Sequence, residues 1–222
     1  MKDCNGLFRR GGWSALWKIL IQKNSGLISI PTLILLVLMS GCASSGDVSL
    51  KNVPRGMTVI TEDEFYDVEG GTVEAIRASL RKNGPAYHGG TVLGLASWRV
   101  SWTYRTALKM GQCEMEQVEV NLHLTITLPH WQPPENADSL LFRYWEKYLE
   151  DLAEHEEGHR TIAIEMARDA TQTLWSLRPF SCADMAAHSK EEVYAILDAY
   201  KEKQQTYDRV YKPIYWPPKL MP

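Results

Sequence analysis

Hydrophobic and polar residues alternate along two central stretches of the chain. The apolar positions of the first stretch are Ala96, Trp98, Val100, Trp102 and Tyr104. Those of the second stretch are Val118, Val120, Leu122, Leu124, Ile126 and Leu128. A period of two is typical of strands that bury one face. The pattern therefore predicts an antiparallel pair of strands connected through Gly111, with the second strand ending at Pro129.

A helical period replaces this alternation between Asp138 and Leu177, a run without proline and with a single glycine. Its inward positions recur at spacings of three and four, and they are Leu141, Trp145, Tyr148, Leu152, His155, His159, Ile162, Met166, Ala170 and Leu174. The pattern predicts one long helix that packs on the apolar face of the strand pair.

Two further helices are expected. Thr72 is a suitable N-cap for a short helix from Val73 to Lys82. Ser189-Lys190-Glu191-Glu192 matches a capping box and predicts a last helix that begins near Lys190 and ends before Pro213. The inward stripe of this helix is Val193, Leu197, Tyr200, Gln204, Tyr207 and Tyr211. With a short strand at residues 66–68 and a surface tail at residues 214–222, the expected class is α+β.

The N-terminus has the pattern of an export signal. Basic residues precede an apolar stretch from Leu27 to Met39, which is short for a membrane span. Met39-Ser40-Gly41-Cys42 then resembles the bacterial lipoprotein box, which predicts a lipid on Cys42. A plain secretory signal and a retained membrane anchor are the alternatives. We expect a signal peptide at residues 1–41, a tether at 42–56 and a folded domain at 57–222.

This interpretation places the protein in the bacterial cell envelope, anchored to the membrane by its lipid. In a Gram-negative host, Ala43 after the cysteine resembles the pattern that directs sorting to the outer membrane, facing the periplasm. Removing residues 1–41 would leave a formal charge of −7 on the mature chain, compared with −3 for the whole sequence. Nothing in this charge distribution suggests a nucleic-acid partner.

Four cysteines are present, and two of them fall in the expected domain. Cys4 lies in the signal and Cys42 carries the expected lipid, so Cys113 and Cys182 remain. An even pair in an oxidising compartment predicts a disulfide bond between them. The alternative is a thiolate zinc ligand.

The long helix carries His155-Glu156-Glu157-Gly158-His159, which matches the H-E-x-x-H signature of zinc metallopeptidases. Residues four apart lie on one face of a helix, so both imidazoles can reach one Zn²⁺ while Glu156 lies beside the water to be activated. The alternative is a pair of structural histidines. Burying this polar trio without a metal or a dedicated hydrogen-bond network would cost several kcal/mol, which favours the metal.

A catalytic zinc needs a third protein ligand. If the last two helices form an antiparallel hairpin, residues at equal distances from the turn lie level. His159 is 18 residues before Leu177, and Asp208 is 18 residues after Lys190. Asp208 is therefore the predicted third ligand, and a solvated carboxylate is the alternative role for this residue.

Three other residues are candidates for the same site. Tyr207 and Tyr211 fall at the height of Asp208 and are expected to donate hydrogen bonds to a developing oxyanion. Glu165 is the rival third ligand on the long helix, but six residues beyond His159 it points to a different side.

With these residues identified, the chain resembles the bacterial family designated domain of unknown function 922, described as predicted secreted zinc-dependent proteases. The matching features are Tyr66-x-Val68-x-Gly70, Gly84-Pro85, Trp98-x-Val100-x-Trp102-x-Tyr104, Cys113, Leu128-Pro129-x-Trp131, His155-Glu156-x-Gly158-His159, Cys182 and Tyr207-Asp208. The resemblance implies a zincin-like fold, with His155 and His159 as zinc ligands and Glu156 as general base. In the family, Tyr-Asp is followed by Thr and then His-Gly, whereas Tyr211, Pro213 and Ile214 stand at those places here.

The sequence therefore predicts a lipid-anchored, zinc-dependent metallopeptidase that cleaves a peptide or protein substrate in the envelope. The alternative from another class is a non-catalytic envelope lipoprotein, a binding module with a structural or vestigial metal, which the missing C-terminal histidine favours. A peptidoglycan amidase would use similar metal chemistry and ranks below both.

Overall fold

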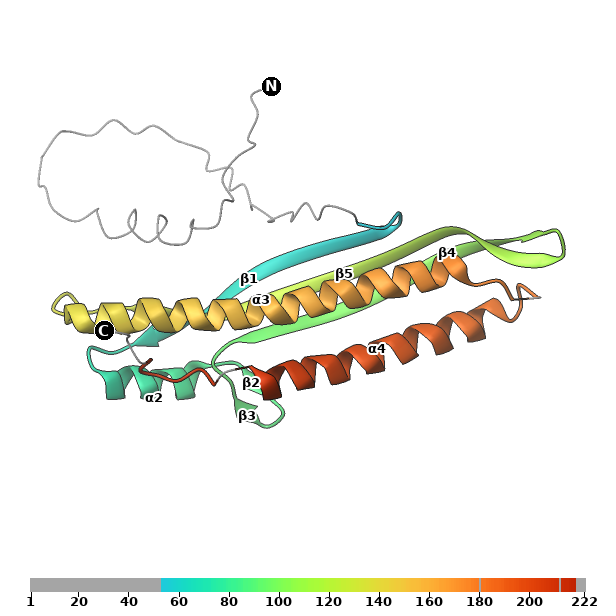
Figure 1. Cartoon of the computed structure of the whole chain (residues 1–222). Helices are drawn as coiled ribbons and strands as arrows, with labels where there is room; N and C mark the ends of the chain where they lie inside the picture. Colours follow the sequence, from blue (N-terminus) through green and yellow to red (C-terminus); the bar gives the residue numbers. More distant parts are fainter. Residues whose placement is uncertain (1–52, 180, 212, 219–222) are drawn as a thin grey trace, which may run out of the picture. The chain divides into compact units, whose positions relative to one another are not determined.

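The computed structural model describes residues 53–179, 181–211 and 213–218 (Figure 1). The elements follow in the order β1 (Met57–Glu69), α2 (Val73–Asn83), β2 (Ala86–Tyr87), β3 (Gly90–Thr91), β4 (Leu95–Lys109), β5 (Gln112–Gln132), α3 (Ser139–Ser176) and α4 (Met185–Val210). The predicted signal peptide, Cys42 and the tether up to residue 52 lie outside the described residues. None of the helices in the described part combines the length and hydrophobicity that a membrane span requires.

Three strands form the main sheet in the order β1-β5-β4. β4 and β5 pair antiparallel, as the alternating pattern predicts, and β1 adds to the other side of β5 in parallel. The expected antiparallel pair is thus part of a small mixed sheet. The short strand predicted at residues 66–68 lies near the end of the much longer β1. Charged residues within β1 interrupt the alternation of apolar and polar positions that would have predicted its full length.

β5 continues through Pro129 to Gln132, so the prediction that this proline ends the strand is wrong. The ladder between β4 and β5 stops at Leu95 and Thr127, before the proline is reached. Beyond that point β5 has β1 as its only neighbouring strand among the described residues. Pro129 therefore interrupts no bond to β4, which is the situation in which a strand tolerates proline.

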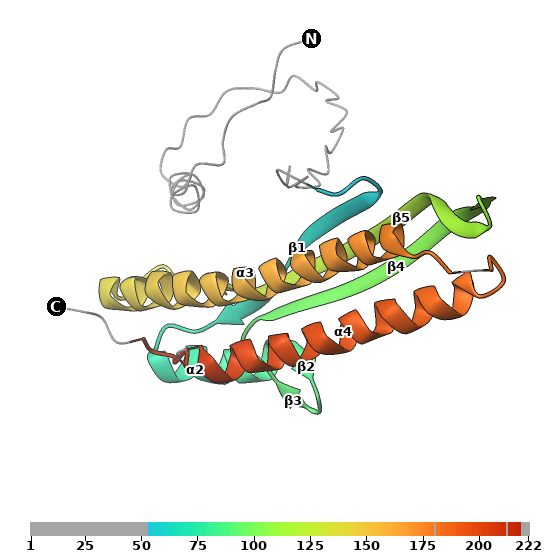
Figure 2. The same ribbon diagram turned by 45° about the vertical axis from the view of Figure 1, so that its right-hand side comes forward.

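α3 has the length and the buried stripe that its period predicts. Asp138 caps it by accepting a hydrogen bond from the backbone N–H of Leu140 at 2.7 Å. The apolar members of its inward stripe are buried, and Met166, Ala170 and Leu174 share one core cluster with the apolar residues of β5. Figures 1 and 2 show α3 lying along the sheet with α4 beside it. α3 is therefore the central helix of the core, and His155 and His159 are carried on its inward side.

α4 begins at Met185 rather than near Lys190, so the capping-box interpretation is wrong. Ser189 lies inside the helix and is 1% exposed. Its hydroxyl donates to the carbonyl oxygen of Ala186 and lies 3.2 Å from the hydroxyl of Tyr104 on β4. Burial of Met185 in the core favours the longer helix.

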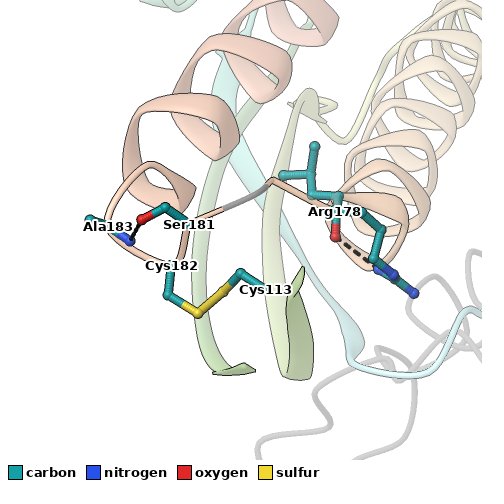
Figure 3. Close-up of a disulfide and its surroundings, with 6 residues drawn as sticks. Cys113, Arg178, Ser181, Cys182 and Ala183 are labelled. Atoms are coloured by element: carbon teal, nitrogen blue, oxygen red, sulfur yellow. Dashed lines mark hydrogen bonds between the residues drawn. A yellow bond between two sulfur atoms is a disulfide. The ribbon is translucent and has the colours of Figure 1, made fainter. Parts of the chain in front are cut away.

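A disulfide bond joins Cys113 at the start of β5 to Cys182 in the turn before α4 (Figure 3). This is the pairing that the cysteine count predicts. The backbone N–H of Cys113 also donates to the carbonyl oxygen of Pro179. The turn between the two long helices is thus attached to the β4–β5 hairpin next to its tip, where Cys113 pairs with Leu108.

The C-terminal tail does not lie on the surface throughout, as the sequence suggested. Trp216 is 8% exposed and packs against Trp145 and Tyr148 of α3, with ring centroids 5.8 and 5.4 Å away. Its indole N–H donates to the carbonyl oxygen of Val73 at 2.8 Å. The tail therefore connects the end of α4 to α2 and α3.

The segment between α2 and β4 contains the short β2–β3 hairpin. This hairpin lies beside the C-terminal end of α4 in both views (Figures 1 and 2). The chain then passes through Leu93 and Gly94 to the start of β4. The Tyr66 hydroxyl donates to the carbonyl oxygen of Leu93 at 2.7 Å and ties this segment to β1.

Candidate metal centre

His155 and His159 lie one turn apart near the middle of α3 and point toward the same place. Their Nε2 atoms are 3.1 Å apart, and their side chains are 16% and 13% exposed. The spacing of four residues brings both rings to one face of the helix. Two imidazole nitrogens of the kind that bind transition metals therefore converge at one point.

α4 delivers a carboxylate to this point. Asp208 Oδ1 lies 2.8 Å from His159 Nε2 and 3.3 Å from His155 Nε2. These three residues form a group that could hold a metal ion, the one such group of histidine, cysteine and acidic side chains found among the described residues. The site is thus built across the α3–α4 pair.

The spacing of the three atoms fits a small metal ion. Ligand atoms about 2.0–2.1 Å from a tetrahedral zinc are about 3.3 Å from one another. The observed separations of 2.8, 3.1 and 3.3 Å are near this value and need only a small expansion. Lone pairs that converge so closely repel unless a proton or a metal cation lies among them.

The hairpin argument reached Asp208 although its assumed helix start was wrong. α4 begins farther toward the tip of the β4–β5 hairpin than α3 ends (Figures 1 and 2). The residues added at the start of α4 therefore extend it beyond α3, and Asp208 still falls level with His159. The rival Glu165 forms an ion pair with Lys203 instead of approaching the histidines.

Glu156 lies between the two histidines in sequence and is 4% exposed. Its carboxylate accepts a hydrogen bond from the backbone N–H of Ala96 at the start of β4. Burial raises the pKa of Glu156 to about 7, against the opposing effects of His159 and of the Ala96 hydrogen bond. A Cβ atom at Gly94 would lie 2.6 Å from Glu156 Oε1, so the glycine leaves room for the carboxylate.

The aromatic rings of Tyr207 and Tyr211 cover His155. Tyr207 stacks on it with centroids 5.2 Å apart and planes at 16°, and Tyr211 lies 4.7 Å away. Burial is the main cause that raises the pKa of Tyr207 to about 12, and electrostatic repulsion from Tyr211 adds to it. Both predicted tyrosines therefore belong to the site, where they fix the position of His155.

Gly158 is required by the same tyrosine. A Cβ atom at this position would lie 2.0 Å from the Tyr207 hydroxyl oxygen. The single glycine of α3 thus allows α4 to approach the histidine pair closely. The sequence offered a signal for this contact, because a glycine inside a long helix lowers its stability and usually has a packing reason.

Gln204 is a site residue that sequence reasoning did not assign. Its side-chain amide contacts the Nδ1 atom and the backbone carbonyl oxygen of His159. The sequence did contain a signal for this role, because Gln204 is a polar residue within the otherwise largely apolar inward stripe of the last helix. By contrast, His155 Nδ1 is buried and has no hydrogen-bond partner among the described residues.

Burial, reinforced by the neighbouring His159, lowers the pKa of His155, and Asp208 opposes this effect. The neutral imidazole is the form that binds a metal. His88 and His123 are exposed and do not belong to this group of side chains.

Comparisons with known proteins give a family but no characterised relative. Neither the curated proteins nor the solved structures contain a match to this chain. The family model described as "Bacterial protein of unknown function (DUF922)" matches residues 63–212. This range includes the two histidines, Glu156, Asp208 and both disulfide cysteines. It covers well over half of the 222-residue sequence, and the chain therefore belongs to this bacterial DUF922 family.

Proposed function

We propose that this protein is a zinc-dependent metallopeptidase of the bacterial cell envelope, anchored by a lipid on Cys42. The observation that carries the proposal is the approach of Asp208 Oδ1 to the Nε2 atoms of both His155 and His159. The lipoprotein box in the sequence supports the anchor, and the H-E-x-x-H pattern supports the reaction class.

His155, His159 and Asp208 would hold the zinc ion, and three protein ligands are what catalytic zinc sites have. When bound, zinc supplies a Lewis acid that polarises a carbonyl oxygen and acidifies water. The histidines on α3 and the carboxylate on α4 offer ligand atoms of the kinds that zinc accepts.

Glu156 is the proposed general base. Its position one residue after His155 puts it beside the metal-binding atoms, and the Ala96 N–H orients its carboxylate. Burial keeps competing solvent away from the carboxylate. In this arrangement Glu156 takes a proton from the attacking water and delivers it to the leaving amine.

An extended peptide is the substrate that this site suits best. β4 is an edge strand of the sheet, and its first residues lie beside Glu156. Main-chain groups on an open strand edge can bind an extended peptide by adding it to the sheet. This edge beside the long histidine-bearing helix is also the feature that supports a zincin-like arrangement.

Substitution of Glu156 tests the mechanism. With zinc supplied, the wild type should cleave members of a quenched fluorescent peptide library, and Glu156→Gln should lose turnover while it retains the metal. Glu157→Gln, an exposed neighbour on the same helix, is the control and should cleave like the wild type. Equal cleavage rates for Glu156→Gln and the wild type would contradict the proposed mechanism.

A binding module with a structural metal is the second candidate. It is favoured by Pro213 and Ile214, which stand where the family has His-Gly. A structural zinc has four protein ligands, whereas a catalytic zinc keeps one position open. The absorption spectrum of the cobalt-substituted protein should change when a small inhibitor such as a hydroxamate is added. An unchanged spectrum would favour the binding module.

A further inference from the structure

The amide of Gln204 binds the backbone and the ring of His159 together. Its Nε2 donates to the His159 carbonyl oxygen at 3.0 Å, and its Oε1 lies within hydrogen-bond distance of His159 Nδ1. Gln204 is partly buried on the face of α4 that packs against α3. Both hydrogen bonds are made by one amide group, so the orientation of that amide in one bond also determines its orientation in the other.

This pair of contacts determines where the ring of His159 carries its hydrogen. A backbone carbonyl oxygen can only accept, so the NH₂ group of Gln204 must face it. The amide oxygen, which also can only accept, must then face Nδ1. Nδ1 is therefore the donor, and the Nε2 lone pair of a neutral His159 points toward Asp208 and His155.

Gln204 and Asp208 lie one helical turn apart on α4 and contact the two nitrogens of the same ring. His155 has no equivalent support, because its Nδ1 lacks a hydrogen-bond partner among the described residues. Its ring is held by the faces of Tyr207 and Tyr211 instead. The orientation of the two histidines thus rests on different interactions.

We propose that Gln204 is the positioning residue of the metal centre, which holds His159 as the Nδ1–H tautomer with Nε2 free to bind the ion. This inference rests on the proposed function for its metal, but the hydrogen bond can be measured without one. Partners that orient a metal-binding histidine change metal affinity by about 10- to 100-fold.

Zinc affinity measured by competition with a chromogenic chelator tests this role. Gln204→Met removes the acceptor with little change in size and should weaken zinc binding about 10- to 100-fold. Gln204→Glu keeps an acceptor for Nδ1–H but loses the donor to the His159 carbonyl oxygen, so it should recover part of that loss. Gln205→Met and Gln205→Glu make the same changes at the exposed neighbour and should bind zinc like the wild type.

The ring proton of His159 gives a second, independent measurement. In the wild type, with or without zinc, the Nδ1–H should give a slowly exchanging downfield proton resonance in NMR spectra. Gln204→Met should lose this resonance and Gln204→Glu should keep it. If Gln204→Met does not fold, the resonance of Gln204→Glu carries the test, and absence of the resonance from this variant would overturn the inferred hydrogen bond.

The outcomes separate this inference from the proposed function. A wild type that binds no zinc but shows the protected ring proton would overturn the metal site and support the Gln204 hydrogen bond. Unchanged zinc affinity in Gln204→Met would overturn the positioning role. Equal weakening in Gln204→Met and Gln204→Glu would overturn it as well, because the acceptor would then be irrelevant.

Discussion

The two ends of the α3–α4 pair are held together by different kinds of interaction. At the turn, Leu174, Met185 and Val193 are fully buried, and the Cys113–Cys182 disulfide fixes the connection. At the other end the helices meet through polar contacts of Gln204 and Asp208 with His159. Asp208 has 54% of its side chain exposed. The same two helices thus share an apolar end and a polar end.

The two kinds of interaction contribute differently to stability and to the geometry of the site. Apolar burial is non-directional, so it determines that the helices pack but leaves the exact atoms in contact free to vary. Hydrogen bonds weaken steeply when their distance or angle is wrong. The turn end therefore supplies most of the stability, and the site end sets the positions of the metal-binding atoms. Changes at the two ends should have different effects on unfolding and on zinc affinity.

Breaking the turn end should have the largest effect on stability. The disulfide closes a loop with a sequence separation of 69 residues, and replacing both cysteines by serine should lower the free energy of unfolding by about 4 kcal/mol. Urea denaturation measures this loss. A reducing agent should destabilise the wild type and leave the double variant unchanged. A loss below about 1 kcal/mol would show that burial alone fixes this end.

Removing the tail contact should weaken the site end. Trp216→Ala deletes a buried ring and its hydrogen bond to Val73, at an expected cost of about 3 kcal/mol in unfolding free energy. Zinc affinity should fall as well, because the tail follows directly after Tyr211. Tyr215→Ala, at a neighbour that is 68% exposed, is the matched control. Equal zinc affinity in Trp216→Ala and the control would exclude a role of the tail at the site.

A smaller effect is expected where the helices approach most closely. Gly158→Ala places a methyl group against the Tyr207 ring and should destabilise the protein by about 2 kcal/mol. In a Tyr207→Ala background the same change should instead stabilise α3, by up to about 1 kcal/mol. Chemical denaturation of the four proteins in this cycle measures the reversal. The same sign in both backgrounds would contradict the close contact.

The fold was predictable wherever one residue period dominated. The stripe of α3 and the alternation in β4 and β5 arise from burial of one face, so a single sequence carries them. β1 was mostly missed, because Glu62, Asp63 and Glu64 interrupt its pattern. The start of α4 was misplaced because a capping box is a local signal, whereas the packing of Met185 and the Ser189 hydroxyl is tertiary.

The site was predictable to the extent that it follows from helix geometry. His155 and His159 lie on one helix at a fixed spacing. Asp208 was predicted by comparing its distance along the chain from the α3–α4 turn with that of His159. Gln204 and Gly94 act across elements that are distant in sequence, and no local pattern marks such contacts. The structure brings the predicted residues together, while zinc and catalysis stay predictions.

Zinc content is the measurement that tests the central claim most directly. Elemental analysis of the purified protein should find about one zinc ion per chain in the wild type and in Asp198→Ala, a change at an exposed aspartate on the same helix. Asp208→Ala and His159→Ala should lose the metal. A wild type that takes up no metal when zinc is supplied, or an Asp208→Ala variant that binds zinc as tightly as the wild type, would contradict the account.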